Sequence, residues 1–246
     1  MFDLVDIHCH ALFGVDDGAD NEVTMKSMLD IAYNDGIRVI CFTPHFKTYE
    51  FRSEKDISSY NNSILESFKI ATEYAKKNLK GMALYLGSEI MCHNEIFDSL
   101  NSDACRSLNN GSYILIEFPL SATAYDIENT VARILRKGYK PVIAHIERYS
   151  ALYKKPELIS ELRNMGALMQ VNARSFTSFK FGKIRRFIKL LLKKRLIDIV
   201  ATDSHDDSFY KPNFSKALPC VIKACGEKYA EKIFSKNAMS ILSNEK

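Results

Sequence analysis

Five of the six histidines in this chain lie in four short segments, each of which follows a run of apolar residues. Neutral imidazole and carboxylate are the ligands that a borderline divalent metal prefers. His8 and His10 share one face of an extended strand because they are two residues apart, and Asp203 and His205 repeat that spacing. The pattern predicts a metal-dependent enzyme. The segments are Asp6-Ile7-His8-Cys9-His10, Thr43-Pro44-His45, Ile143-Ala144-His145 and Asp203-Ser204-His205.

Acidic residues occur at comparable positions. Glu89 follows the apolar segment 82–87, and Glu117 ends the apolar segment 113–117. Burying a carboxylate is costly unless a cation accompanies it, which favours a ligand role for both. In the loop before residue 21, either Asp16 or Asp17 is a candidate ligand, while Asp20 is expected to be the N-cap of the helix that follows.

These positions give nine candidate ligands, more than the three or four protein ligands of a single catalytic zinc. We therefore expect two or three metal ions with bridging carboxylates, an arrangement that neutralises phosphoryl oxygens. The candidates are His8, His10, Asp17, His45, Glu89, Glu117, His145, Asp203 and His205.

The elements that must position these residues are strands and helices in alternation. Each helix has to cross back over the sheet, so the strands are expected to be parallel. The predicted strands are 4–8, 39–43, 82–87, 113–117, 141–145, 168–171 and 197–202. The predicted helices are 22–34, 55–79, 127–137, 156–165 and 183–194, followed by two more helical stretches.

The candidate ligands follow six of the seven predicted strands, which distinguishes between two kinds of parallel sheet. In an open sheet only the strands beside the switch point share a site, whereas in a barrel all strand ends converge on one face. We therefore expect an α/β fold, a distorted (β/α)7 TIM-like barrel, as a single domain over residues 1–246.

Composition excludes several classes of protein. The hydrophobic content is 46% of 246 residues, which is ordinary for a globular core, and the net charge of +4 is too small to indicate nucleic-acid binding. The apolar runs are too short to span a membrane, and acids stand where a signal peptide would be basic, so we expect a cytoplasmic protein. None of the six cysteines has an arginine six positions later, so a cysteine-based phosphatase is excluded.

The motifs carry a resemblance to a known family. They are DIHCH, GVDDGA, TPHF, GSEI, IEFP, AHIERY, VNARS and TDSH, and they extend from residue 6 to residue 205. In this order they resemble the polymerase and histidinol phosphatase (PHP) superfamily. Within it they are similar to the bacterial metal-dependent protein-tyrosine phosphatases of the CpsB/YwqE type.

The resemblance implies a PHP-type barrel and a three-metal site, usually manganese, with iron, magnesium, cobalt or zinc as alternatives. The ligand set that it implies is His8, His10, Glu89 and Asp203 for one ion, Glu89, Glu117 and His145 for the second, and Asp17, His45 and His205 for the third. The family register selects Asp17 over Asp16. Arg148 matches an arginine that grips the substrate phosphate, and it is expected to be catalytic together with Asp203 and His205.

The implied reaction is hydrolysis of a phosphomonoester. The implied substrate is phosphotyrosine in the C-terminal tail of a bacterial tyrosine kinase that controls capsule or exopolysaccharide synthesis. Two alternatives stay open: a histidinol-phosphate or other small-molecule phosphatase of the superfamily, and a regulatory protein with a degenerate site. No nucleic-acid partner and no membrane span are expected, and the sequence does not determine the oligomeric state.

The sequence departs from the family pattern in ways that bear on substrate preference. No arginine follows the final Asp-x-His motif, and Lys211 is the candidate replacement, although it lacks bidentate geometry. Phe46 and Lys47 occupy positions where a further histidine is common. His93 is expected at the rim of the site. The basic segment 183–195 is interpreted as the solvated face of an outer helix, with nucleic-acid binding or docking to an acidic kinase surface or an anionic membrane as alternatives.

Overall fold

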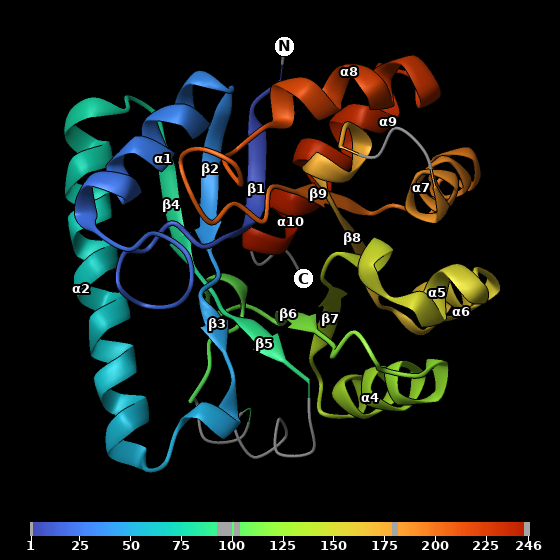
Figure 1. The fold of residues 1–246 in the computed structure, drawn as a ribbon, viewed down its shortest axis with the longest axis horizontal. Helices are drawn as coiled ribbons and strands as arrows, with labels where there is room; N and C mark the ends of the chain where they lie inside the picture. The colour runs from blue at the N-terminus through green and yellow to red at the C-terminus, as the bar shows by residue number, and fades with distance from the viewer. Residues whose placement is uncertain (1, 93–99, 101–103, 179–181, 244–246) are drawn as a thin grey trace.

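The computed structural model describes residues 2–92, 100, 104–178 and 182–243. In these ranges the strands form one curled parallel array made of two sheets (Figure 1). The first sheet has the order β1-β2-β4, with β1 at Leu4–Cys9, β2 at Ile37–Phe42 and β4 at Ala83–Leu86. The second has the order β3-β5-β6-β7-β8-β9, formed by His45–Phe46, Glu89–Met91, Tyr113–Glu117, Lys140–Ile143, Leu168–Asn172 and Ile199–Ala201.

Two of the predicted strands are each divided into two pieces. β2 leads into β3 across Thr43 and Pro44, and β4 leads into β5 across Gly87 and Ser88. Pairing continues across the break, because the Gly87 amide donates to the Phe42 carbonyl at 2.8 Å. A Cβ atom at Gly87 would lie 2.7 Å from Leu108 Cδ2, so a larger residue at this position would require the Leu108 side chain to shift. The seven predicted strands are thus present in the described ranges, two of them interrupted.

The first and last strands close the array. Cys9 pairs with Ser204 in a parallel bridge, the Asp203 amide donates to the His8 carbonyl at 2.8 Å, and the His10 amide donates to the Ser204 carbonyl at 2.9 Å. We call this contact between β1 and the segment after β9 the closing seam. It confirms the prediction of a distorted (β/α)7 barrel.

Most of the helices lie outside the strands, whereas α10 lies between β1 and β9, where its Ile241 packs in one cluster with Val5 and Ile7 (Figure 1). α1 and α2 lie beside β1, β2 and β4, whereas α4 to α7 lie on the side of β7 and β8. Their bounds are α1 Glu22–Asn34, α2 Glu54–Asn78, α4 Ala124–Arg136, α5 Ser150–Lys154, α6 Glu157–Met165, α7 Lys183–Lys194, α8 Phe214–Cys225, α9 Glu227–Glu231 and α10 Asn237–Leu242.

Two local predictions were wrong. The N-cap of α1 is Asn21, whose side chain accepts from the Thr24 amide at 2.9 Å, because the helix begins one residue later than Asp20 would allow. β7 ends at Ile143, and His145 has left-handed backbone with φ of 32°, which cannot continue a strand. The two helical stretches expected after the last strand are present in the described chain: α8, and a continuous stretch of α9, the π-helical turn Lys232–Lys236 and α10, with Gly226 at φ of 85° between them.

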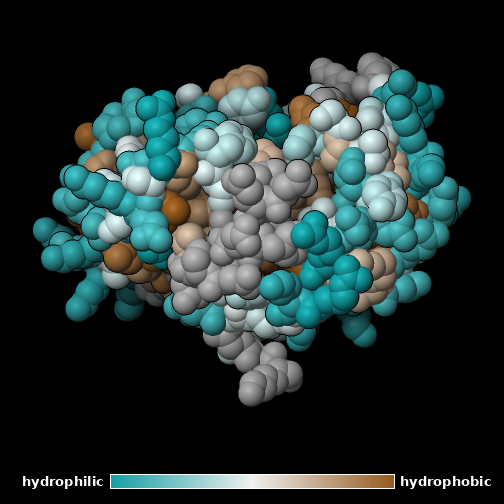
Figure 2. Space-filling view, turned by 90° about the horizontal axis from the view of Figure 1, so that it is seen from below, coloured by the Kyte–Doolittle hydropathy of each residue, from teal (hydrophilic) through white to brown (hydrophobic). Residues whose placement is uncertain are grey.

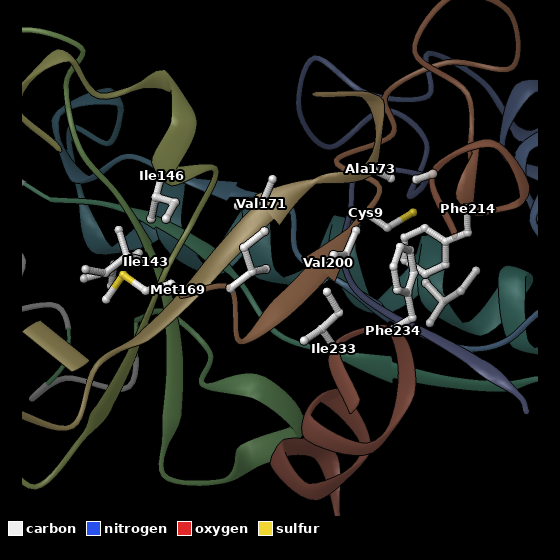
Figure 3. Packing of buried hydrophobic residues seen from close by; sticks show 14 of the residues in the cluster. Cys9, Ile143, Ile146, Met169, Val171, Ala173, Val200, Phe214, Ile233 and Phe234 are labelled. Atoms are coloured by element: carbon white, nitrogen blue, oxygen red, sulfur yellow. The ribbon is translucent and has the colours of Figure 1, made fainter. Parts of the chain in front are cut away.

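The core lies between the strands and the helices. Figure 3 shows Val171 of β8 and Val200 of β9 in the same cluster as Ile233, with Phe214 and Phe234 beside them. The rings of Phe214 and Phe234 meet edge to face at 5.1 Å, which fixes α8 against the π-helical turn Lys232–Lys236. This packing holds the strands whose ends carry the candidate ligands.

The surface agrees with the expected outer helices. On α7 the side chains of Phe187, Ile188, Leu191 and Leu192 are buried while most of its lysines and arginines are exposed, which confirms the predicted basic face. Figure 2 shows a face with mostly hydrophilic side chains around the grey atoms and isolated hydrophobic residues between them. Within the described ranges, no helix has the length and apolar character needed to cross a membrane.

Candidate metal centre

The structure brings all nine predicted ligands together, each within 4 Å of another member of the set. They come from the ends of the strands and the segments that follow them, as a barrel requires. The contacts define three overlapping groups in which every ligand atom lies within 4.8 Å of the others. The groups are His8, His10, Glu89 and Asp203; His10, Asp17, His45 and His205; and His45, Glu89 and Glu117.

The first group surrounds the Nε2 atoms of His8 and His10, which lie 3.1 Å apart. Glu89 Oε2 is 3.2 Å from His8 Nε2 and 3.3 Å from His10 Nε2. Asp203 Oδ1 is 3.2 Å from His8 Nε2 and 3.6 Å from His10 Nε2. Two imidazoles and two carboxylates therefore point at one another inside the protein, where only 11% of the Asp203 side chain is exposed.

The second group lies nearer to solvent. Asp17 Oδ1 is 3.4 Å from His45 Nε2 and 3.7 Å from His205 Nε2. The ring of His205 stacks on that of His10 at 4.0 Å and an interplanar angle of 16°. Asp17 is the most exposed ligand of this group, at 67% of its side chain.

The third group lies around Glu89 and Glu117. His145 Nε2 is 2.9 Å from Glu89 Oε1 and 3.8 Å from Glu117 Oε2, so it faces both carboxylates, as the resemblance implies. His45 also reaches them, with Nδ1 at 3.0 Å from Glu89 Oε2 and 3.2 Å from Glu117 Oε1. The carboxylates of Glu89 and Glu117 therefore lie between two imidazoles.

Several polar atoms of this group have no hydrogen bond among the described residues. They are His45 Nδ1, Glu89 Oε2 and Glu117 Oε1, all of them buried. Burying a carboxylate is costly unless a cation accompanies it. His45 Nδ1 faces the two carboxylate oxygens at 3.0 Å and 3.2 Å, and a donor set of one imidazole and two carboxylates fits a bound cation.

The groups behind the histidines fix which ring nitrogen is available. Gln170 Oε1 accepts from the His145 amide at 2.7 Å, so it also acts as acceptor towards His8 Nδ1 at 3.2 Å. His10 Nδ1 lies 2.7 Å from Asp16 Oδ2, and His205 Nδ1 lies 3.0 Å from the Asp203 carbonyl oxygen. In each case Nδ1 donates outwards and Nε2 keeps its lone pair for a metal, the usual arrangement of ligand histidines.

The same contacts separate the roles of Asp16 and Asp17. Asp16 accepts from the His45 amide at 2.9 Å and from the Gly18 amide at 3.0 Å, in addition to its contact with His10. The Asp16 oxygens are therefore occupied by contacts with His10, His45 and Gly18. Asp17 instead faces His45 and His205. A side chain at Gly18 would overlap the His10 carbonyl at 1.8 Å, so glycine is required where this loop passes His10.

The clustering of charge shifts the pKa values of the histidines. Burial lowers the pKa of His10, but Asp16 and Glu89 outweigh it and raise the pKa well above its ordinary value. The same balance, with Glu117 and Glu89, raises the pKa of His45 to about 9. Burial raises the pKa of Glu89, but His8 and the other histidines around it hold the pKa well below its ordinary value. In the metal-free protein, the raised histidine pKa values thus favour protonated rings, whose positive charge balances the carboxylates in the absence of metal ions.

The backbone is strained at two of the ligands. His145 has φ of 32° and Asp203 has φ of 53°, both in the left-handed region that non-glycine residues avoid. Such strain persists where the surroundings fix it, typically at functional sites. For Asp203 the surroundings include Asn172, whose Nδ2 donates to Asp203 Oδ2 at 2.6 Å.

Six of the nine predicted ligands line a cleft of about 1260 Å³: Asp17, His45, Glu89, Glu117, Asp203 and His205. Arg148 lines it with an exposed side chain and is not paired with Glu147, which is buried and accepts from Ser175 Oγ at 2.6 Å and the Asn172 amide at 3.0 Å. Lys211 lines a neighbouring hollow of about 340 Å³ instead. His93 lies outside the described residues.

Three residues at this site were not among the candidates proposed from the sequence, although Asn172 and Arg174 lie in the VNARS motif. Gln170 and Asn172 hold ligands by hydrogen bonds, and Arg174 lines the cleft. The available signal was the polar side chain of Gln170 inside an apolar strand. Burying an amide there is unfavourable unless it has partners, which points to a supporting role.

Residues 4–243 match the family described as capsular polysaccharide synthesis, CpsB/CapC. The chain is 31% identical over 246 residues to the tyrosine-protein phosphatase CpsB of Streptococcus agalactiae, covering 98% of this chain and 99% of that protein. It is also 31% identical over 247 residues to the tyrosine-protein phosphatase YwqE of Bacillus subtilis, covering 98% of this chain and 92% of that protein.

Comparison with solved structures identifies the same group of proteins. The crystal structures of YwqE from Bacillus subtilis and CpsB from Streptococcus pneumoniae, described as unique metal-dependent tyrosine phosphatases, include a chain that matches with a TM-score of 0.86 and 29% identity. The match covers 99% of this chain and 96% of that one. The resemblance inferred from the motifs is confirmed, and this chain belongs to the CpsB/CapC family of capsular polysaccharide synthesis.

Proposed function

We propose that the protein is a metal-dependent phosphatase that hydrolyses phosphotyrosine in a protein substrate, with residues 1–246 acting as one catalytic domain. The observation that carries the proposal is the buried cluster of His45, Glu89 and Glu117 beside a large cleft, in which facing imidazole and carboxylate atoms form no hydrogen bond among the described residues. The names of the relatives CpsB and YwqE, both tyrosine-protein phosphatases, support the same activity for this chain.

The donor set fits two or three divalent ions, and we propose Mn²⁺ as the native metal. One ion is assigned to His8, His10, Glu89 and Asp203, one to Glu89, Glu117 and His145, and one to Asp17, His45 and His205. Divalent ions held there would lower the pKa of a bound water molecule and neutralise charge on the phosphoryl oxygens of the substrate. Mixed imidazole and carboxylate ligation suits Mn²⁺, Fe²⁺, Co²⁺ or Zn²⁺.

Around this centre the chain supplies its own groups for the substrate. Arg148 presents an exposed guanidinium to the cleft, where it can bind the phosphate and stabilise charge that develops on it. Asp203 and His205 also line the cleft. The pKa of His205 is lowered, by burial first and then by His10, so its ring is neutral at neutral pH and able to act as a ligand or accept a proton.

The cleft wall suits an aromatic substrate in an extended peptide. Tyr49, Phe209 and Tyr210 line it and are exposed at 61%, 69% and 49%. Their rings can contact a tyrosine ring or neighbouring peptide side chains. We propose the C-terminal tail of a bacterial tyrosine kinase of capsule synthesis as the substrate. We also propose a cytoplasmic location, which is consistent with the six free cysteines.

The test compares hydrolysis of a phosphotyrosine peptide with that of histidinol phosphate. The full chain is stripped with a chelator and assayed before and after reloading with Mn²⁺. We expect peptide hydrolysis that requires metal and exceeds hydrolysis of histidinol phosphate. His8→Ala and Asp203→Ala should each lower kcat/KM by more than about 100-fold, at least the effect of losing an outer-shell partner.

Asp35→Asn serves as the control, because this carboxylate lines the neighbouring hollow rather than the cleft. It should retain the wild-type rate. Preference for histidinol phosphate would refute the phosphotyrosine assignment. Wild-type rates in His8→Ala and Asp203→Ala would refute the metal centre itself.

A further inference from the structure

Arg174 lies in the cleft on a short 3-10 turn, Ala173–Phe176, that directly follows β8. Its Nη1 donates to the Phe209 carbonyl at 3.0 Å, and its Nε donates to Ser178 Oγ at 3.3 Å. The guanidinium carbon lies 4.0 Å from the ring centre of Phe209 and 4.2 Å from that of Tyr210. The side chain is therefore fixed by two hydrogen bonds and two aromatic rings.

These contacts hold the guanidinium without neutralising it. Among the described residues, no carboxylate lies within ion-pair distance of Arg174, and its Nη2 has no hydrogen bond. Arg163 shows the contrast, because its Nε and Nη2 bond to both oxygens of Asp198 at 2.9 Å and 2.7 Å. Stacking on a ring leaves the edge of a guanidinium free to donate, and a planar fork of this kind matches phosphate.

Arg174 is also connected to the candidate metal centre. The Tyr210 carbonyl accepts from the His205 amide at 3.0 Å, and the two rings lie 6.4 Å apart. On the other side, Asn172, two residues before Arg174, donates to Asp203 at 2.6 Å. Both segments that position the guanidinium are thus attached to ligands of the centre.

We propose that Arg174 is a second phosphate-binding residue of this site, which acts with Arg148 on the phosphate of the substrate. This inference rests on the proposed phosphatase function. A phosphomonoester dianion accepts charge-assisted hydrogen bonds in a bidentate manner from a guanidinium. Lys211, the replacement considered from the sequence, lines the neighbouring hollow and is not part of the cleft.

The experiment compares Arg174→Gln, Arg174→Lys and the control Lys211→Ala in the full, Mn²⁺-loaded chain. Two quantities are measured: kcat and KM for a phosphotyrosine peptide, and the Kd of inorganic phosphate by calorimetry. Arg174→Gln should raise both KM and Kd by roughly 10- to 100-fold, the range of one charge-assisted hydrogen bond, with a smaller change in kcat. Arg174→Lys should recover part of the loss, and Lys211→Ala should stay within about twofold of wild type.

Metal content and Tm of the variants are measured alongside, because a structural role for Arg174 would change these as well. Wild-type phosphate affinity and kcat/KM in Arg174→Gln would overturn the proposal, as would an equal loss in Lys211→Ala. If the wild-type chain binds phosphate in a manner that depends on Arg174 but hydrolyses no phosphotyrosine peptide, the proposed function fails while the phosphate-binding role stands.

Discussion

Gln170 is the group whose replacement most directly tests how the metal centre is assembled. It is fully buried on β8 and makes three hydrogen bonds. Its Oε1 accepts from the His145 amide at 2.7 Å and faces His8 Nδ1 at 3.2 Å, and its Nε2 donates to Asn172 Oδ1 at 2.8 Å. Methionine has nearly the same shape and cannot replace these bonds.

The magnitude follows from the partners that Gln170→Met leaves behind. The buried His145 amide loses its acceptor, and the His8 ring loses the group that fixes its tautomer. An unsatisfied buried group costs about 1–3 kcal/mol, so we expect the metal-free protein to lose about 3 kcal/mol of unfolding free energy. For a chain of this size, that loss lowers Tm by about 6–12 °C. Loss of an outer-shell partner should weaken metal binding by about 10- to 100-fold.

The assay is competition for Mn²⁺ against a chromophoric chelator, with thermal unfolding of the metal-free protein measured in parallel. Arg163→Met is the matched control, because it breaks the ion pair with Asp198 at 2.7 Å, and neither residue belongs to a ligand group. It should lower Tm and leave metal affinity unchanged. If Gln170→Met binds Mn²⁺ as tightly as Arg163→Met does, hydrogen bonds to Gln170 do not orient the ligands and the reasoning is refuted.

Three other predictions concern protons and backbone space. At pH 7.5 the raised pKa of His45, about 9, keeps its ring protonated in the metal-free protein, so Mn²⁺ binding should release a proton. Calorimetric heats that do not vary with the ionisation enthalpy of the buffer would contradict this. For the same reason, the metal-free protein should lose stability as pH rises from 6.5, the ordinary pKa of His45, to its folded value of about 9, as followed by urea unfolding. Gly18→Ala should lower both Mn²⁺ affinity and Tm because the new Cβ overlaps the His10 carbonyl, and a variant with wild-type affinity would show that this loop does not position Asp17.

The candidate site could be anticipated from the sequence to the extent that its residues follow apolar strands. His8, Glu89 and Asp203 have side chains that are costly to bury alone, so their position after such strands indicated a shared site, and the structure brings them together. The barrel followed from the same positions, because only a closed array brings six strand ends to one face.

Other features depended on tertiary contacts that a linear pattern does not contain. The division of the second and third predicted strands arises where Pro44 cannot donate a hydrogen bond and where Gly87 passes close to Leu108. The left-handed backbone of His145 is fixed by surrounding contacts, including the bond from its amide to Gln170. Arg174 was overlooked because its role depends on Phe209 and Tyr210, which are 35 and 36 positions further along the chain.

The closing seam determines when, during synthesis and folding, the ligand group of His8 and His10 becomes complete. Cys9 and Ser204, which pair across it, are 195 residues apart in the chain. Contacts between residues so distant in sequence form late in folding, because their loop-closure entropy must be overcome first. On the ribosome, the ligand group of His8 and His10 stays incomplete until Asp203 has left the exit tunnel. A metal ion that needs all four members of this group can therefore bind only after the seam has formed, so the metals available to the folded protein would decide which ion this group holds.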